Sequence, residues 1–128
     1  MHRPLLALLA AVVFGLIPAI GGAEEKQITD VKELAGKWQG WVTSQLGAQT
    51  RAIMTIKEDG SYEGSTIGAG STMTVGTYYL DGGRLRYRSS RTEGSVAVFE
   101  EKGKTIIRLS PEGTYSYVSG PAEFERLK

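Results

Sequence analysis

The stretch Leu34-Ala-Gly-Lys-Trp-Gln-Gly-Trp-Val42 decides the fold, because a helical pattern ends in it and a strand pattern begins in it. Just before it, Asp30 and Glu33 stand three residues apart, which is the capping-box pattern of a helix start. Gly36 then ends this short helical turn. From Lys37 onward, apolar and polar residues alternate with the period of two that is typical of strands. The segment before the turn, Glu24–Thr29, is polar and is expected to be a flexible lead.

Alternating segments separated by turn residues recur along the rest of the chain. We expect eight strands: Lys37–Thr43, Thr50–Lys57, Ser61–Thr66, Thr72–Leu80, Arg84–Ser89, Ser95–Glu100, Thr105–Leu109 and Thr114–Val118. Turns such as Glu58-Asp-Gly60 and Asp81-Gly-Gly83 are strong hairpin signals, since glycine supplies the positive φ that they need. Connections this short join antiparallel neighbours, because a parallel crossover needs about a dozen residues.

This order predicts an all-β, eight-stranded, antiparallel up-and-down barrel. Closure of the sheet removes both exposed edges. Eight is also the strand number whose interior fits either packed side chains or one small ligand. The alternative is a β-sandwich, but sandwiches usually contain longer Greek-key connections than any visible here. The pattern therefore favours a single barrel domain over residues 24–128.

The first 23 residues are expected to be a signal peptide. A short basic start precedes an apolar run, and Gly21-Gly-Ala23 supplies the small residues of a cleavage site after Ala23. The alternative is a membrane anchor, but the run is shorter than the roughly 20 apolar residues of a span, and Gly15 and Pro18 interrupt it. We therefore expect a periplasmic or secreted protein.

Composition excludes several kinds of chemistry. The chain has no cysteine, and its one histidine, His2, lies in the leader. A histidine base, a thiol nucleophile and a His/Cys metal site are therefore absent from the barrel, and we expect no enzyme activity and no cofactor. One of the 15 basic residues, Arg3, also lies in the leader, and the remaining 14 balance the 14 acidic residues. A neutral domain has no bulk electrostatic attraction to nucleic acid or to an anionic membrane.

Alternation also predicts which side chains point inward. The expected inward residues, besides Gly40, are Trp38, Val42, Ala52, Met54, Ile56, Tyr62, Met73, Val75, Thr77, Tyr79, Leu85, Tyr87, Ser89, Val96, Val98, Ile107, Leu109, Tyr115 and Tyr117. This interior is rich in tyrosine, and a buried tyrosine hydroxyl needs a hydrogen-bond partner. A mostly apolar cavity with a few polar groups is typical of small-molecule sites. We therefore predict that a ligand contacts Trp38, Tyr62, Thr77, Tyr79, Tyr87 and Tyr115; a filled core remains the alternative.

The start of the barrel resembles the calycin superfamily. Lipocalins open with a Gly-x-Trp motif after one helical turn, and Gly36 and Trp38 match it. The resemblance implies that Trp38 closes the barrel floor and that an arginine near the end of the last strand packs across it. Arg126 is the candidate, although it lies beyond the last strand that the pattern predicts.

Two other barrel families resemble parts of the chain. Gly36-Lys-Trp38 and Tyr62-Glu-Gly64 are similar to the first hairpins of avidins, but Ser44 and Ala48 replace the Asn and Ser that bind biotin there. Glu33-Leu-Ala-Gly-Lys-Trp38 resembles the small periplasmic inhibitors of secreted metalloproteases, whose amino-terminal residues enter the protease. That resemblance implies a protein-interaction barrel in which residues 24–29 contact the partner.

Two features are expected on the outer surface. Arg84, Arg86 and Arg88, with Arg91 beyond them, form a basic stripe that suits either an anionic partner or a solvated strand face. Trp41 points away from Trp38 and could anchor a protein partner, as aromatic residues do at interfaces. The main hypothesis is a barrel that binds a small, partly apolar molecule, and the alternative is the protein-interaction barrel.

Overall fold

A computed structural model gives the fold, and it describes residues 24–43, 47–68, 73–90, 92–113 and 120–127. Among these residues the one helical element is the 3-10 turn η2 (Val31–Leu34). The nine strands are β1 (Glu24–Glu25), β2 (Gly36–Thr43), β3 (Gln49–Ile56), β4 (Ser61–Thr66), β5 (Met73–Asp81), β6 (Arg84–Ser89), β7 (Glu93–Glu101), β8 (Lys104–Pro111) and β9 (Ala122–Arg126). The leader 1–23 lies outside the described residues, and no helix among the described residues is long and apolar enough to cross a membrane.

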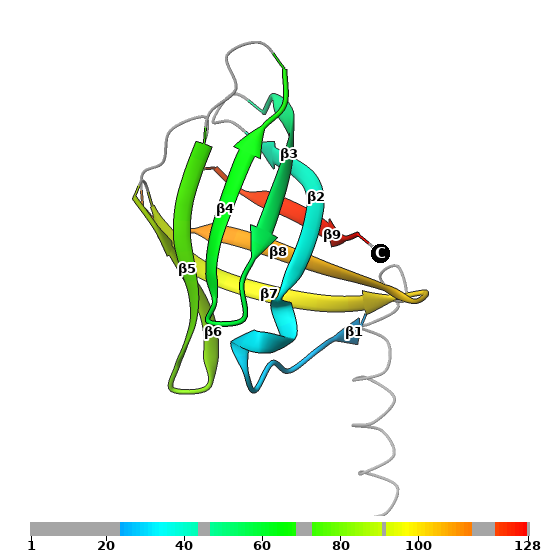
Figure 1. The fold of residues 1–128 in the computed structure, drawn as a ribbon, viewed down its shortest axis with the longest axis vertical. Coiled ribbons are helices and arrows are strands. Elements are labelled where there is room, and N and C mark those ends of the chain that lie inside the picture. The colour runs from blue at the N-terminus through cyan, green and yellow to red at the C-terminus, as the bar shows by residue number, and fades with distance from the viewer. Residues whose placement is uncertain (1–23, 44–46, 69–72, 91, 114–119, 128) are drawn as a thin grey trace, which may run out of the picture.

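Strands β2 to β9 close into an eight-stranded antiparallel barrel (Figure 1). Each strand pairs with the next from β2 to β9, and β9 pairs back with β2, from Trp38 opposite Arg126 to Val42 opposite Ala122. The prediction of an up-and-down all-β barrel is confirmed. The cycle of strand pairings therefore closes within residues 36–126.

The strand that closes the barrel is β9, not the expected segment Thr114–Val118, which lies outside the described residues. In β9, Ala122 and Phe124 are buried, and Glu123 is exposed. The strand therefore has the period-two pattern, but its two glutamates make it a weak strand former by propensity. Its pairing with both neighbours decides its conformation.

The segment before the helical turn is packed against the barrel, so the expectation of a flexible lead is wrong. β1 pairs with the end of β7, and the backbone N–H of Lys26 donates to the Val98 carbonyl at 2.7 Å. Ile28 is only 4% exposed and belongs to the core. β6 pairs with β7 only near Gly94, at the start of β7, so the N-terminal segment fills the remaining part of this seam.

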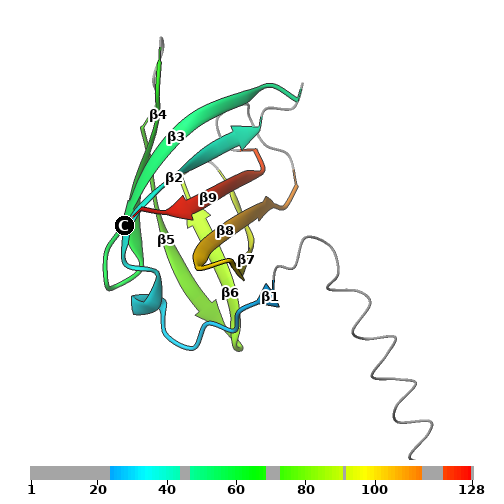
Figure 2. The same cartoon turned by 90° about the vertical axis from the view of Figure 1, so that its right-hand side faces the viewer.

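One end of the barrel is closed by η2 (Val31–Leu34), which lies across it (Figure 2). The capping box is present: Asp30 accepts from the Lys32 N–H at 2.9 Å, and Glu33 accepts from the Asp30 N–H at 3.1 Å. The turn buries Leu34 completely, and the Leu34 carbonyl accepts a hydrogen bond of 3.0 Å from Trp38 Nε1. The turn is thus fixed to the floor of the barrel.

Arg126 packs over Trp38 at the same end. Its guanidinium carbon lies 4.5 Å from the centre of the indole ring, within the range of a cation–π contact. Its two terminal nitrogens donate to the carbonyls of Ala35 at 2.7 Å and Glu33 at 2.6 Å, the last carbonyls of the turn. The arginine that the lipocalin resemblance implied is therefore at the expected place, on the strand that sequence patterning missed.

Candidate functional site

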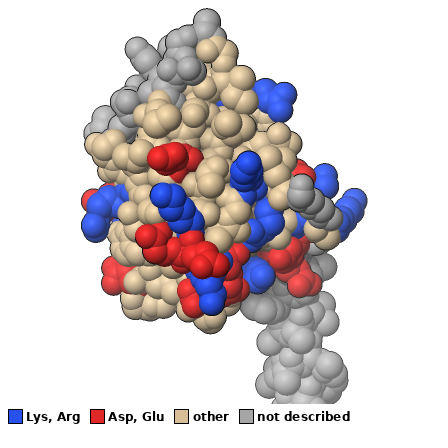
Figure 3. Space-filling view, in the orientation of Figure 1, with Lys and Arg blue, Asp and Glu red and all other residues tan. Residues whose placement is uncertain are grey.

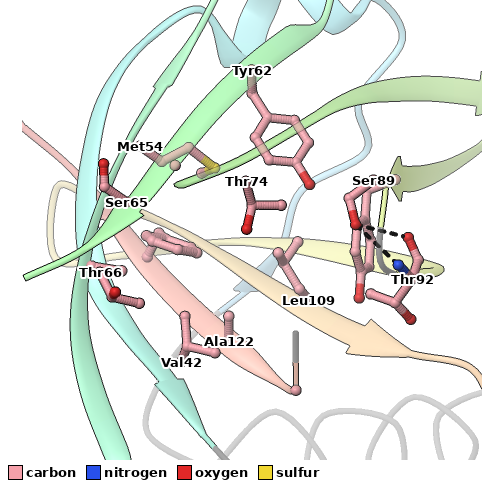
Figure 4. A pocket seen from close by; sticks show the side chains of 15 residues that line it. Val42, Met54, Tyr62, Ser65, Thr66, Thr74, Ser89, Thr92, Leu109 and Ala122 are labelled. Carbon is pink, nitrogen blue, oxygen red and sulfur yellow. Dashed lines mark hydrogen bonds between the residues drawn. The ribbon is translucent and has the colours of Figure 1, made fainter. Parts of the chain in front are cut away.

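A cavity opens at the end of the barrel opposite the Trp38 floor (Figure 4). Its volume is about 60 Å³, and its lining is mainly apolar. The residues that line it come from every barrel strand except β7 and from the segments beside the strands: Val42, Ala52, Met54, Tyr62, Gly64, Ser65, Thr66, Thr74, Tyr87, Ser89, Thr92, Leu109, Gly120, Ala122 and Phe124. Since roughly 10–15 Å³ measured in this way holds one water molecule, the space admits a small molecule.

An aromatic cluster packs in the barrel interior beside the cavity. Tyr78 is 1% exposed and packs between Tyr62 and Tyr87, with ring centroids 4.8 and 6.4 Å away. Its hydroxyl donates to Met54 Sδ at 3.2 Å. Below it, Trp38 and Ile107 are completely buried. The barrel is therefore neither wholly hollow nor wholly filled: it has a packed floor and an open upper chamber.

Glycine makes room for this cluster at one point of β5. Gly76 pairs directly with Tyr62, and a Cβ placed on Gly76 would lie 2.7 Å from the Tyr62 ring and 2.3 Å from the Arg88 carbonyl. Only a residue without a side chain fits there. The ring of Tyr62 thus lies over the backbone of β5, with its hydroxyl near the upper chamber.

The polar groups of the chamber are hydroxyls. Tyr62 hydrogen-bonds with Ser89, and the Ser89 hydroxyl also donates to the Thr92 carbonyl at 3.1 Å and accepts from the Thr92 N–H at 3.0 Å. The Tyr87 hydroxyl is different: it is buried and has no partner among the residues that the structure describes. Because an unpaired buried hydroxyl costs about 1–3 kcal/mol, Tyr87 presents an unused hydrogen-bonding group to whatever enters the chamber.

Burial raises the pKa of all three tyrosines. Removal from water disfavours the phenolate and raises the pKa of Tyr62 to about 12, an effect that the bond from Ser89 partly opposes. Burial likewise raises the pKa of Tyr78 and of Tyr87, and the neighbouring tyrosines add to it. All three side chains are therefore neutral at physiological pH.

These shifts predict a loss of stability in alkali. In the unfolded chain tyrosine ionises near pH 10, so the stabilisation is complete below pH 10 and is lost as the pH rises through about 12, the pKa of folded Tyr62. Ionisation of Tyr62 alone should lower the free energy of unfolding by about 2–3 kcal/mol once the pH has passed both pKa values. Urea unfolding between pH 9 and pH 12 measures it, and Tyr62→Phe should reduce the slope. A free energy that stays level over this range would contradict the assignment.

The structure brings only some of the predicted ligand-contacting residues together. Tyr62 and Tyr87 line the chamber, 7% and 2% exposed. Trp38 points inward as predicted, but it lies in the packed floor and does not line the chamber. Tyr115 lies outside the described residues, as does Tyr117.

The predicted inward face of β5 is wrong. Thr77 is exposed, Tyr79 is only partly buried, and Met73 and Val75 are 63% and 50% exposed. Both faces of this strand carry apolar residues, and a shift of one residue turns every side chain to the other side. The fit of Gly76 against Tyr62 selects the opposite assignment, with Tyr78 inward.

Tyr79 instead belongs to the outer surface, within the predicted arginine stripe. Arg88 lies 5.0 Å above its ring, and its hydroxyl hydrogen-bonds with Arg86. The stripe does face outward, but acidic residues pair with it: Arg86 makes a double hydrogen bond to Glu112 at 2.8 and 3.1 Å, and Arg88 lies 3.9 Å from Glu93. Arg91 lies outside the described residues. Pairing therefore neutralises Arg86 and Arg88, and of the described part of the stripe only the exposed Arg84 has no ion pair with another described residue.

Five polar residues of the chamber were not among the predicted site residues: Ser65, Thr66, Thr74, Ser89 and Thr92. Thr74 comes from the misassigned face of β5, Ser89 was expected only to point inward, and Thr92 lies in the connection after β6. Connection residues follow no alternation, so no sequence signal identified Thr92. The described residues contain no group of three or more His, Cys, Asp or Glu side chains that could hold a metal ion. The chamber therefore offers apolar contact and hydroxyl hydrogen bonds.

The architecture defines an eight-stranded antiparallel β-barrel that is consistent with a calycin-like fold. Comparison with known proteins adds no closer assignment. No protein-family model, no curated protein and no solved structure matches the chain. The functional argument accordingly depends on the geometry of the barrel and its chamber.

Proposed function

We propose that the protein is a lipocalin-like binding barrel whose upper chamber holds a small, neutral, mostly apolar molecule. The observation that carries the proposal is the Tyr87 hydroxyl, which is buried beside an apolar cavity and has no partner among the described residues. A ligand that accepts its hydrogen bond would remove this penalty and bury its own apolar surface at the same time. Binding, rather than catalysis, is the activity that such groups support.

The chamber also constrains the ligand. None of the described residues that line it is charged, and an unpaired charge would be poorly stabilised among them. Its volume is well below the roughly 300–1,000 Å³ of pockets for drug-sized molecules. A short alkyl chain that carries a carbonyl or ether oxygen fits both limits. The floor of Trp38 and Arg126 supports the lipocalin-type assignment, since it reproduces the closed end that this resemblance implies.

The protease-inhibitor alternative is less well supported. It needs residues 24–29 free to enter a protease, whereas the backbone of Lys26 is bonded to β7 and Ile28 is buried in the core. We retain the periplasmic or secreted location as part of the proposal, because the leader 1–23 supports it. Native mass spectrometry of the protein purified from its own host tests both the removal of the leader and the presence of a ligand. The measured mass should be that of residues 24–128 plus a small molecule that is lost on denaturation.

Tyr87→Phe provides the direct test, with 2-butanone and butane as probes. The wild-type barrel should bind the ketone more tightly than the alkane, and Tyr87→Phe should weaken ketone binding by about tenfold while alkane binding stays the same. Without ligand, the variant should be as stable as the wild type or more stable, because it removes an unpaired buried hydroxyl. Calorimetric titration and urea unfolding measure the two effects.

Tyr78→Phe is the matched control. It makes the same chemical change on the neighbouring ring, but Tyr78 does not line the chamber and its hydroxyl is bonded to Met54. Ketone affinity should be unchanged in this variant. Equal ketone affinity in wild type and Tyr87→Phe would remove Tyr87 from the site, and the absence of any binding of either probe would count against the chamber as a ligand site.

A further inference from the structure

Large apolar side chains are exposed on one side of the chamber's mouth. The exposed fractions are 45% for Trp41, 46% for Ile53, 51% for Ile67, 63% for Met73 and 50% for Val75. Of the large apolar residues that the structure describes as exposed, only Leu127 lies elsewhere, at the closed end after β9. We call these five residues the apolar rim; a concentration of this kind on a soluble domain marks an interaction surface.

Strand register shows that the apolar rim is continuous across β2, β3, β4 and β5. Trp41 pairs with Arg51, and the Arg51 carbonyl accepts from the Ile67 N–H at 2.9 Å. Nearer the closed end, Ile53 of β3 and Met73 of β5 both pair with Ser65 of β4, the strand that lies between them. Val75 follows Met73 on the same side of β5 and pairs with Glu63, an exposed carboxylate that bounds the rim toward the closed end. The rim is thus a surface beside the cavity opening, not a set of scattered side chains.

Charged side chains on this face are concentrated away from the apolar rim. In Figure 3, the charged side chains gather over the lower half, toward the turns of the closed end, and the upper half is mostly uncharged. The described residues of the β3–β4 turn include Lys57, Glu58 and Asp59, all exposed. The molecule therefore has a polar closed end and an apolar side at its open end.

We propose that the apolar rim docks on the surface of a lipid bilayer. Trp41 and Arg51 form a cation–π pair, with the guanidinium 5.5 Å from the indole centre, and Arg51 makes no ion pair among the described residues. Tryptophan is enriched where a protein meets the bilayer interface, and a cationic neighbour complements lipid phosphates. The aliphatic side chains beside this pair supply the apolar area that interfacial binding needs.

The position of the rim favours a bilayer over a second copy or another protein. The surface adjoins the open end of the chamber, and a bilayer is the place where small apolar molecules concentrate. Docking there would bring the mouth next to a reservoir of ligand. The choice of a bilayer over a second copy thus rests on the proposed chamber ligand, whereas the docking contacts use outward side chains and need no occupied cavity.

Flotation with vesicles tests the proposal on residues 24–128, the closed barrel with its N-terminal segment. Phosphatidylcholine vesicles should bind it, and replacing a quarter of the lipid with phosphatidylglycerol should raise binding by no more than about fivefold, since one unpaired arginine is involved. The double variant Met73→Ser/Val75→Ser should bind about tenfold more weakly. The fluorescence of Trp41, measured in Trp38→Phe, should shift to the blue with vesicles.

Leu127→Ser is the matched control, because it removes a similarly exposed apolar side chain from the closed end. It should bind vesicles like the wild type. Equal losses in both variants, or no vesicle binding at all, would overturn the proposal. A dimer in solution that Met73→Ser/Val75→Ser dissociates would overturn it in favour of a second copy. Tyr87→Phe should leave vesicle binding unchanged, so failure of the chamber ligand and failure of the docking surface are distinguishable.

Discussion

Replacing Trp38 with Ala should lower the free energy of unfolding by about 3–5 kcal/mol, the range typical of a large side chain removed from a packed core. The indole is completely buried, and its Nε1 donates to the Leu34 carbonyl. Its ring also supports Arg126, whose guanidinium holds the carbonyls of Glu33 and Ala35. The substitution therefore leaves a cavity and loosens the turn that closes the barrel.

Trp41→Ala is the control for this prediction, because it is the same change three residues away on the opposite face. Trp41 is 45% exposed, so its loss should lower stability by about 1 kcal/mol or less. Urea unfolding followed by far-ultraviolet circular dichroism suits both variants, since most of the signal comes from the backbone amides and each variant keeps one tryptophan. Similar losses in the two variants would show that Trp38 does not hold the floor.

The turns explain why the architecture could be predicted from the sequence. Gly60 and Gly83 have φ of 94° and 84°, values that glycine adopts freely. The residues that favour these turns fix where each hairpin reverses, and short connections then leave only antiparallel neighbours. Local chemistry therefore determines most of the barrel. The closing strand is an exception, because Ala122–Arg126 is made a strand by β2 and β8 on either side of it.

The site was harder to predict because its geometry depends on contacts between distant residues. Tyr62 and Tyr87 could be placed inside by alternation, since polar residues flank them clearly. Alternation failed in β5, where both faces are apolar and the decisive contact is that of Gly76 with Tyr62 on the neighbouring strand. That the Tyr87 hydroxyl lacks a partner is a property of the packed interior, and no pattern in the sequence encodes it.

Gly40→Ala should be the most damaging small substitution on the barrel wall, with a loss of about 3 kcal/mol or more. Gly40 lies in the middle of β2 and pairs with Ala52 on one side and Phe124 on the other. A Cβ at this position would lie 1.8 Å from the Glu123 carbonyl oxygen and 2.7 Å from the Phe124 Cα. These are backbone atoms of the closing strand, so no side-chain rotation can relieve the overlap.

Gly64→Ala is the matched control, because it makes the same change on another barrel strand, where the nearest atom to the new Cβ is the Ile53 carbonyl oxygen at 3.6 Å. That is an ordinary contact, and alanine loses less backbone entropy on folding than glycine, so its stability should stay within about 1 kcal/mol of the wild type. Urea unfolding of the two variants measures the difference. If both are equally stable, β2 and β9 are not as close at Gly40 as the register requires. If Gly40→Ala alone is destabilised, the close approach of β2 and β9 is what closes the barrel wall beside Phe124 and the upper chamber.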